Sequence, residues 1–370
     1  MSAQNDFPAR PEAKPGPMRI ARYVGGKSTV SGGTNRTIKL SSNENPHGSS
    51  PKAREALIEC AKSLHLYPDG GATALREAIA DAEGLDPARI VCGAGSDELI
   101  SLLCTAYAGP GDTVLHSAHG FLMYRITALA CGAEPVSIPE IDLTADIDGL
   151  IAAADETTKL VFLANPNNPT GTLIPNSEIR RLRAELPPHT LLVIDSAYAE
   201  YVIAEGYEAG AKLVAETENT VMTRTFSKAH GLAALRLGWC YAPESVVDAL
   251  NRVRGPFNVG APSLAAGLAS IGDPDFIDFS REDNLKQRAR VAEALAAMGI
   301  ESCDSHGNFL LSRFGENGVP NAADADAFLQ TRGLIVRRIE GYGLAEYLRI
   351  SIGTAEENGV LLAAMQDLPR

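Results

Sequence analysis

The chain has 370 residues, of which 45% are hydrophobic, enough for a large core and for two structural units. It carries 33 basic and 46 acidic side chains, a net charge of −13, and it has no basic run. Nucleic acid is therefore a poor candidate partner, because that affinity depends on lysine and arginine neutralising phosphates. A small anionic ligand stays compatible with the charge, since a local basic pocket can form on an acidic protein.

The sequence predicts neither a membrane segment nor a metal site. No apolar run approaches the roughly 20 residues that cross a bilayer. Residues 1–18 are polar and proline-rich, without the apolar region of a secretory signal, and we expect residues 1–33 to form an arm. The six cysteines are scattered, and none forms a C-x-x-C pair, so we expect reduced thiols in a cytoplasmic protein.

The first predicted helix follows this arm. Ser50 and Pro51 have the residue types of a helix N-cap and of the first helical position. An apolar face follows at helical spacing and comprises Ala53, Ala56, Leu57, Cys60 and Leu64. The spacing therefore predicts an amphipathic helix that packs along this face.

Short apolar strands alternate with helices in the middle of the chain. "RIVCGAGSDELISLLCTAYAGPGDTVLHS", residues 89–117, predicts a strand, a glycine turn, a helix, a Pro-Gly turn and another strand. Three more apolar runs, "TKLVFLA", "HTLLVID" and "NTVMTRT", each end in polar residues. Such continuously apolar strands indicate a parallel sheet covered on both faces, so we predict an α/β fold with a large domain at residues 34–255.

The pattern changes after residue 255. A long helix that includes "REDNLKQRARVAEALAAMGI" precedes the strand "NFLLSRF", the helix "ADADAFLQTRG", the strand "YLRISIG" and a terminal helix. Here strands and helices do not alternate regularly. We therefore expect residues 256–370 to form a smaller α+β domain.

Candidate site residues follow the predicted strands, where ligands of parallel sheets bind. Asp195 ends the apolar run "LLVID", and a carboxylate there is costly unless it is paired. It is either a structural ion pair or helix cap, or the partner of a protonated ring nitrogen, as a pyridoxal cofactor requires. Tyr198 is close enough to reach the hydroxyl of such a ring. Asn168, in "NPNNPTG", is a turn former or a ligand-shaping residue.

Lys228 is the candidate nucleophile. Apolar surroundings and a second cation depress the pKa of a lysine, so that its neutral amine can attack a carbonyl. Thr225 and Ser227 can donate to a phosphate, and Arg236 offers a two-pronged contact to it. A phosphorylated pyridine aldehyde would meet the demands of these residues and of Asp195 together.

A second anion-binding element is possible where a helix is predicted to begin. Gly95, Ser96 and Asp97 precede that helix, and Ser and Asp are ordinary caps, which is the better interpretation when they are taken alone. Beside the other strand ends, the free N–H groups of the helix terminus would contribute to an anion site.

Stretches along almost the whole chain resemble the fold-type I pyridoxal-phosphate aminotransferases, and within them the histidinol-phosphate aminotransferase branch. "NPNNPTG", "DSAY" and "SKAHGLAALRLGW" resemble the superfamily most specifically. Further similar stretches are "RYVGGKS", "LSSNENPHGSSPKA", "YPDGGATALREAIA", "GAGSDELI", "VRR" and "LRISIGT". The resemblance implies pyridoxal 5'-phosphate as the cofactor.

It also implies roles. Lys228 would bind the cofactor covalently, Asp195 would pair its ring nitrogen, and Tyr198 and Asn168 would bond its ring oxygen. The phosphate would be held by Gly95, Ser96, Thr225, Ser227 and Arg236, and Asp97 would be a further cofactor-binding residue. Tyr67, in "YPDG", would reach the cofactor of a second subunit, which implies a homodimer with shared sites. The substrate would be bound by Tyr23, Asn168, Arg337 and Arg349, with Arg349 on its carboxylate and Arg337 on its distal anion.

One residue departs from the family pattern. Phe121, in "HGFLMY", stands where the family commonly places a tyrosine that stacks on the pyridine ring. A phenylalanine can still stack, but it lacks the hydrogen bond of the phenol. The cofactor prediction is therefore kept, and the substrate preference is left more open.

The expected activity is transfer of an amino group between histidinol phosphate and 2-oxoglutarate, in histidine biosynthesis. One alternative on the same scaffold is an aromatic-amino-acid aminotransferase, and another is a pyridoxal-phosphate decarboxylase of an amino-acid phosphate. A cofactor-binding regulator without turnover is the alternative of another class. The acidic charge argues against that regulator, as does the lack of a helix-turn-helix segment before the core.

Overall fold

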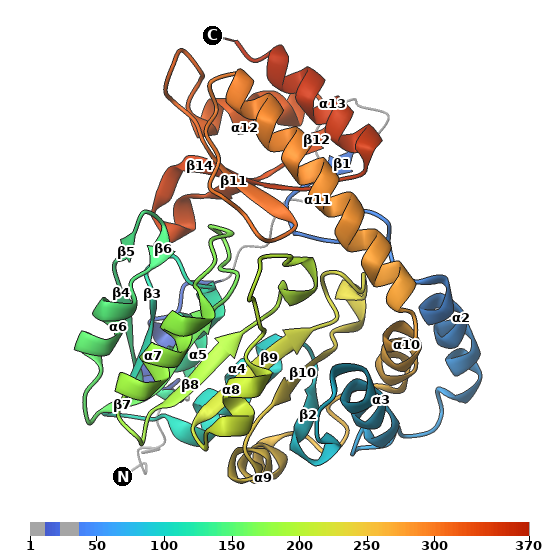
Figure 1. Cartoon of the computed structure of the whole chain (residues 1–370), viewed down its shortest axis with the longest axis vertical. Coiled ribbons are helices and arrows are strands. Elements are labelled where there is room, and N and C mark those ends of the chain that lie inside the picture. The colour runs from blue at the N-terminus through green and yellow to red at the C-terminus, as the bar shows by residue number, and fades with distance from the viewer. Residues whose placement is uncertain (1–11, 23–36, 370) are drawn as a thin grey trace, which may run out of the picture.

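The computed structural model describes residues 12–22 and 37–369 and shows two units (Figure 1). The large unit surrounds a seven-stranded sheet, and the small unit contains the C-terminal helices and a three-stranded sheet. Of the expected arm, only residues 12–22 are described, and they include the short helix α1 (Pro15–Met18), which packs on α5 (Leu122–Cys131). The rest of that arm lies outside the described residues.

The large sheet has the strand order β2-β10-β9-β8-β7-β3-β4. Only β10 runs antiparallel to its neighbours, and all other pairs are parallel, which confirms the predicted mostly parallel sheet. Its strands are β2 (Ile90–Gly93), β3 (Thr113–Ser117), β4 (Glu134–Ile138), β7 (Thr158–Ala164), β8 (Leu191–Asp195), β9 (Thr220–Thr225) and β10 (Gly238–Tyr241). A separate hairpin consists of β5 (Glu140–Ile141) and β6 (Thr144–Ala145).

Both faces of this sheet are buried, as the continuous apolar runs predict. In β7, Leu160 and Phe162 join the core under α4, α5 and α9, whereas Val161 and Leu163 join the core under α6 and α7. The helices of the first face are α4 (Ser96–Tyr107), α5 and α9 (Glu244–Val253). Those of the second face are α6 (Ile147–Ala153), α7 (Asn176–Glu185) and α8 (Ala211–Glu216). Alternation along one strand thus supplies two cores at once.

A third group of helices covers the β2 and β10 end of the sheet. It consists of α2 (Pro51–Cys60), α3 (Thr73–Glu83) and α10 (Ala261–Ile271), which pack together. Of the apolar face predicted for α2, only Ala53 is buried, and Leu64 beyond it is 62% exposed. Ser50 precedes α2 as predicted, but its hydroxyl donates to the Asp273 carboxylate instead of capping the helix.

The small unit has its own hydrophobic core. Its antiparallel sheet has the order β11-β14-β13, with β11 (Phe309–Arg313), β13 (Arg337–Ile339) and β14 (Leu344–Ser351). A parallel pair, β1 (Ile38–Lys39) and β12 (Leu334–Ile335), adds a strand from the other end of the chain. The surrounding helices are α11 (Pro274–Ala297), α12 (Ala322–Thr331) and α13 (Ala355–Gln366).

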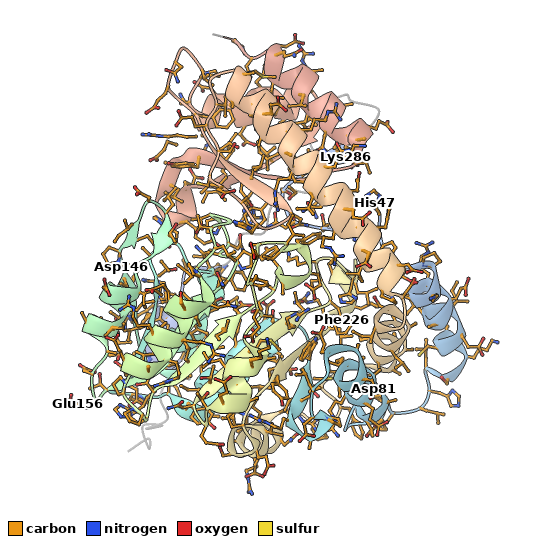
Figure 2. All side chains as sticks on the ribbon, viewed as in Figure 1. His47, Asp81, Asp146, Glu156, Phe226 and Lys286 are labelled. Carbon is orange, nitrogen blue, oxygen red and sulfur yellow. The ribbon has the colours of Figure 1, made fainter. Side chains whose placement is uncertain are left out.

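Helix α11 runs from the large unit to the small one (Figure 1). Near its start, Asp283 lies 2.8 Å from Nε2 of His47, and Figure 2 shows His47 beside this helix. Near its end, Val291 and Leu295 belong to the core of the small unit. Phe226, by contrast, lies inside the large unit in Figure 2 and is fully buried.

The hydrophobic cores of the two units do not follow the single predicted boundary between residues 255 and 256. Val259 and Ala266 share a core with α3, in the large unit. Ile38 and Leu40 share a core with α11 to α13, in the small unit. We therefore propose that the small unit contains residues 38–40 and that the large unit extends through α10. Within the described ranges, no helix is long and apolar enough to cross a membrane.

A close backbone contact supports the turn that follows Lys228. Gly231 has a φ of 67°, and its N–H donates to the Lys228 carbonyl at 2.9 Å. A Cβ atom at Gly231 would lie 1.8 Å from the backbone oxygen of Gly48. Only glycine fits here, because the left-handed conformation and the lack of space both exclude a side chain.

We predict that Gly231→Ala destabilises the protein more than Gly84→Ala does. Both glycines have a positive φ, and this conformation costs a non-glycine residue about 1–2 kcal/mol. A Cβ at Gly84 meets open space, so only the Gly231 variant must also displace backbone. Thermal unfolding of both variants measures the difference, and equal losses would show that the contact with Gly48 is unimportant.

Candidate functional site

A cavity of about 240 Å³ lies at the carboxyl ends of β7, β8 and β9. The polar residues that follow these strands do meet there, as the strand-end argument predicts. The loop that follows β1 completes the cavity wall with Ser42 and Glu44. The predicted residues that line the cavity are Ser96, Asp97, Phe121, Asn168, Asp195, Tyr198, Thr225, Ser227, Lys228 and Arg236.

Asp195 ends the central strand β8 and is only 4% exposed. Its Oδ2 accepts a hydrogen bond from the Tyr124 hydroxyl at 2.7 Å, and its Oδ1 accepts one from Thr223 at 3.2 Å. Burial raises the pKa of the Asp195 carboxyl, while the bonds from Tyr124 and Thr223 lower it. The carboxylate is therefore held in place by neutral donors and lines the cavity.

Lys228 follows β9 and is partly buried. Its Nζ lies 3.4 Å from the Ser42 carbonyl and 5.6 Å from the centre of the Tyr198 ring. Burial, and next the positive charge of Arg349, lower the pKa of the Lys228 amine to about 8. The sequence argument predicted this direction, and a neutral amine is thus accessible near neutral pH.

One end of the cavity, formed by α4 and the loop after β9, has groups that can bind an anion. Ser96 begins α4, whose first N–H groups are free to bind an anion. Arg236 donates to Ser227 Oγ at 3.2 Å and to Asp97 Oδ2 at 2.9 Å. A Cβ at Gly95 would lie 2.6 Å from Nη2 of Arg236, so glycine permits this close approach.

The Tyr198 hydroxyl is tied to the small unit. It accepts a hydrogen bond from the Asn43 amide at 3.0 Å. Asn43 in turn accepts at Oδ1 from Ser351 of β14 at 2.9 Å, and its carbonyl accepts from Asn308 at 3.0 Å. Burial raises the pKa of the Tyr198 phenol, so this group stays protonated. A buried network of amides and hydroxyls therefore fixes the phenol at the cavity wall.

Arg349 and Asn168 form a contact between the two units. Arg349, on β14, donates from Nη1 to Asn168 Oδ1 at 2.6 Å and from Nη2 to the Ser41 carbonyl at 2.8 Å. Its side chain is buried, and its positive charge lowers the pKa of Lys228. The arginine is thus beside the cavity, behind Asn168.

Arg337 lies at a second, larger cavity of about 760 Å³. Phe121 lines both cavities, so the two meet at this ring. The second cavity contains the arginines Arg19, Arg22, Arg125, Arg337 and Arg338, together with the acidic Asp326 and Glu340. A ligand in the smaller cavity therefore has a basic space beyond Phe121.

Of the predicted residues that the structure describes, Tyr67, Gly95, Arg337 and Arg349 do not line the smaller cavity. Tyr67 is 83% exposed and stacks on Phe257, with the ring centres 4.6 Å apart. It therefore faces away from the cavity of its own chain. Tyr23 lies outside the described residues.

Several residues of the site escaped sequence reasoning. Tyr124 lies on helix α5, and nothing local in the sequence signals its contact with Asp195. Asn43 and Ser42 lie in "LSSNENP", far along the chain from the strands that they contact. The only signal in the sequence was the density of polar residues in that stretch.

The arrangement suits a ligand with a carbonyl, a basic ring nitrogen and a phosphate. Lys228 could supply the amine, Asp195 the charge for a ring N–H, and Arg236 with the start of α4 the phosphate contacts. Within the described part of the chain, no cluster of three or more His, Cys, Asp or Glu side chains is suited to hold a metal ion.

We predict that Arg349→Met raises the pKa of Lys228 above about 8, because it removes a positive charge that favours the neutral amine. The measurement is the pH dependence of acylation of Lys228 in the cofactor-free protein, followed by mass spectrometry. Arg337→Met, one strand away, is the matched control and should leave the midpoint unchanged. A midpoint that does not move in Arg349→Met would contradict the electrostatic role of this arginine.

Comparison with known proteins places the chain in a family. Residues 35–365 match the model of aminotransferase class I and II. Histidinol-phosphate aminotransferases from Rhodospirillum rubrum and Paramagnetospirillum magneticum are 56% and 54% identical to it. The first alignment covers 96% of both chains, and the second covers 96% of this chain and 98% of the relative.

Among solved structures, histidinol-phosphate aminotransferase from Sinorhizobium meliloti, in complex with pyridoxal-5'-phosphate, superposes with a TM-score of 0.87 at 26% identity. That match covers 99% of this chain and 98% of the other. The fold, the convergent strand ends and these matches agree. The chain belongs to the class I and II aminotransferases, which depend on pyridoxal phosphate.

Proposed function

We propose that this protein transfers the amino group of histidinol phosphate to 2-oxoglutarate, in histidine biosynthesis. The observation that carries this proposal is the basic cavity beyond Phe121, which would receive a distal phosphate or carboxylate. The names of relatives more than half identical over nearly the whole chain support it. The basic cavity also gives a chemical reason why the substrate should carry a distal anion.

The residues of the smaller cavity would hold pyridoxal phosphate. Asp195 would pair its ring nitrogen, and Tyr198 and Asn168 would contact its ring oxygen. When bound, the cofactor supplies a carbonyl that accepts the amino group and a protonated ring that accepts electrons. Its phosphate would be held by the start of α4 with Gly95 and Ser96, and by Thr225, Ser227 and Arg236, which Asp97 would orient.

Lys228 would move the proton at Cα of the substrate. A base works best with a pKa near the working pH, and burial brings the pKa of this amine to about 8. Phe121 would stack on the ring from the side of the second cavity and help to exclude water. The same amine serves both directions of the exchange, because each half requires a proton to leave or reach Cα.

Two arginines would bind the two ends of the substrate. Arg349 would clamp the α-carboxylate of glutamate, next to Asn168. Arg337 would bind the distal anion, which is a phosphate in histidinol phosphate and a carboxylate in glutamate. Tyr23 is proposed as a further substrate contact on the resemblance alone. One basic cavity thus accommodates two unlike donors.

We also propose a homodimer with shared sites. Tyr67 and Leu66 are exposed beside the poorly covered helix α2, as are Leu64 and Ile58. A monomer rarely leaves large apolar side chains grouped in this way, and a second copy would bury them. The exposed Tyr67 would then reach the cofactor phosphate of the other subunit. Free thiols at all six cysteines support a cytoplasmic protein.

The substrate proposal predicts that Arg337→Ala raises the KM for histidinol phosphate and for glutamate by roughly tenfold to a hundredfold. A hydrogen bond to a buried anion is worth about 1.5–3 kcal/mol. Phenylalanine has no distal anion, so its kcat/KM should hardly change. The measurement is kcat/KM for the three donors in the parent and the variant.

Arg332→Ala is the control for loss of one positive charge, since Arg332 pairs with Asp367 at the surface. It should leave all three donors unchanged. Equal losses for the three donors in Arg337→Ala would show a structural role for this arginine. A parent enzyme that prefers phenylalanine to histidinol phosphate would identify it as an aromatic-amino-acid aminotransferase instead.

The dimer proposal predicts that two inactive variants restore activity when their subunits exchange. Tyr67→Ala and Lys228→Ala each damage both sites of their own dimers. A mixed dimer would contain one site with both changes and one with neither, so random mixing should return roughly a quarter of the parental activity. Subunit exchange is checked with differently tagged chains. Confirmed exchange without recovery would contradict shared sites.

A further inference from the structure

The hydrogen bond between Tyr124 and Asp195 is the shortest that the carboxylate receives from a side chain of the described residues. The phenol oxygen lies 2.7 Å from Asp195 Oδ2, whereas the Thr223 hydroxyl lies 3.2 Å from Oδ1. Both donors are neutral, and both belong to buried side chains. The charge of Asp195 is therefore supported from behind by hydroxyl groups, while the cavity side remains available to a ligand.

Tyr124 is held rigidly in the position from which it donates. Its side chain is 1% exposed. Its ring stacks on Phe162 of β7 at 4.6 Å with an interplanar angle of 3°, and it meets Phe121 edge to face at 5.9 Å. The phenol therefore loses little further freedom when it bonds to Asp195, and it connects the aromatic wall of the cavity to the carboxylate.

We propose that Tyr124 is a positioning residue for the cofactor, and that it acts through Asp195. Its hydroxyl keeps this carboxylate charged and aimed at the ring nitrogen. The inference rests on the proposed pairing of Asp195 with that nitrogen, and it assigns a role to a residue that need not touch the cofactor itself.

The physical reason is the cost of a buried charge. A carboxylate out of water favours its neutral form, and burial does raise the pKa of Asp195. A hydrogen bond donated by a neutral hydroxyl stabilises the charged form more than the neutral form and so opposes this effect. Without Tyr124, Asp195 would more easily take up a proton and lose its attraction for a protonated ring.

Tyr124 is suited to this task because it stays a donor. Burial raises the pKa of its phenol well above the ordinary value, and the nearby charge of Asp195 raises it further. The hydroxyl therefore keeps its proton while Asp195 is charged.

The test compares two ligands on the cofactor-free full-length protein. Pyridoxal phosphate and its 1-deaza analogue share the aldehyde and the phosphate, but the analogue has C–H in place of the ring nitrogen. Equilibrium dialysis gives the affinity of each for the parent and for Tyr124→Phe. We expect the variant to bind pyridoxal phosphate roughly tenfold to a hundredfold more weakly and the analogue no more weakly than the parent does.

Matched variants separate this role from general damage. Thr223→Val should weaken the binding of pyridoxal phosphate but not of the analogue, because Thr223 donates to the other carboxylate oxygen of Asp195. Thr223→Ser keeps the hydroxyl and should keep the affinity. Tyr207→Phe removes a phenol that donates to the Asn165 carbonyl at 3.1 Å and should preserve the preference for the ring nitrogen. Equal weakening of both ligands by Tyr124→Phe, or no weakening of either, would overturn the inference.

Asp195→Asn distinguishes the two proposals. If Asp195 pairs the ring nitrogen, this variant loses most of the preference for pyridoxal phosphate over the analogue. A full preference in Asp195→Asn would overturn the pairing itself, and the role of Tyr124 with it. A preference lost in Asp195→Asn but intact in Tyr124→Phe would overturn only the role of Tyr124.

Discussion

The burial of one carboxylate at the end of the central strand constrains most of this site. Asp195 sits between β7 and β9, so its charge must be balanced by groups on neighbouring elements. Thr223 on β9 and Tyr124 on α5 supply hydroxyls, and the Asn165 N–H on the β7 side bonds the Asp195 carbonyl at 2.9 Å. The register of β8 with β9 and the packing of α5 therefore affect the site directly, because a shift of either would remove a hydrogen bond from the Asp195 carboxylate.

The positions of β2, β3, β7, β8 and β9, and the meeting of the ends of β7, β8 and β9, could be predicted from the sequence, whereas β4 and β10 were not predicted. Continuous apolar runs that end in Asn, Asp or Thr and Lys have a simple meaning in a parallel sheet, because both faces are buried and the carboxyl ends share an edge. The depressed pKa of Lys228 followed from the same reasoning, and the structure adds Arg349 as the source of the charge. These features depend on short stretches of chain.

The remaining features depend on contacts between distant stretches, which no local pattern encodes. Asn43 bonds to Tyr198, and Arg349 bonds to Asn168 across the two units. Tyr124 has the residue type and spacing of a core position, and only the structure shows its hydroxyl on Asp195. The incomplete burial of α2 could not be foreseen, because an apolar helix face looks the same whether it packs within the chain or against another copy.

The pairing of β1 with β12 has a consequence for how the chain is made. Ile38 and Leu40 belong to a core whose other members lie between residues 291 and 368. Synthesis on the ribosome runs from the N-terminus, so the strands of the large sheet, residues 90–241, emerge long before the partners of β1 do. Until then Ile38 and Lys39 lack the partner with which they form β1, and a stretch of two residues offers only a short edge to another chain.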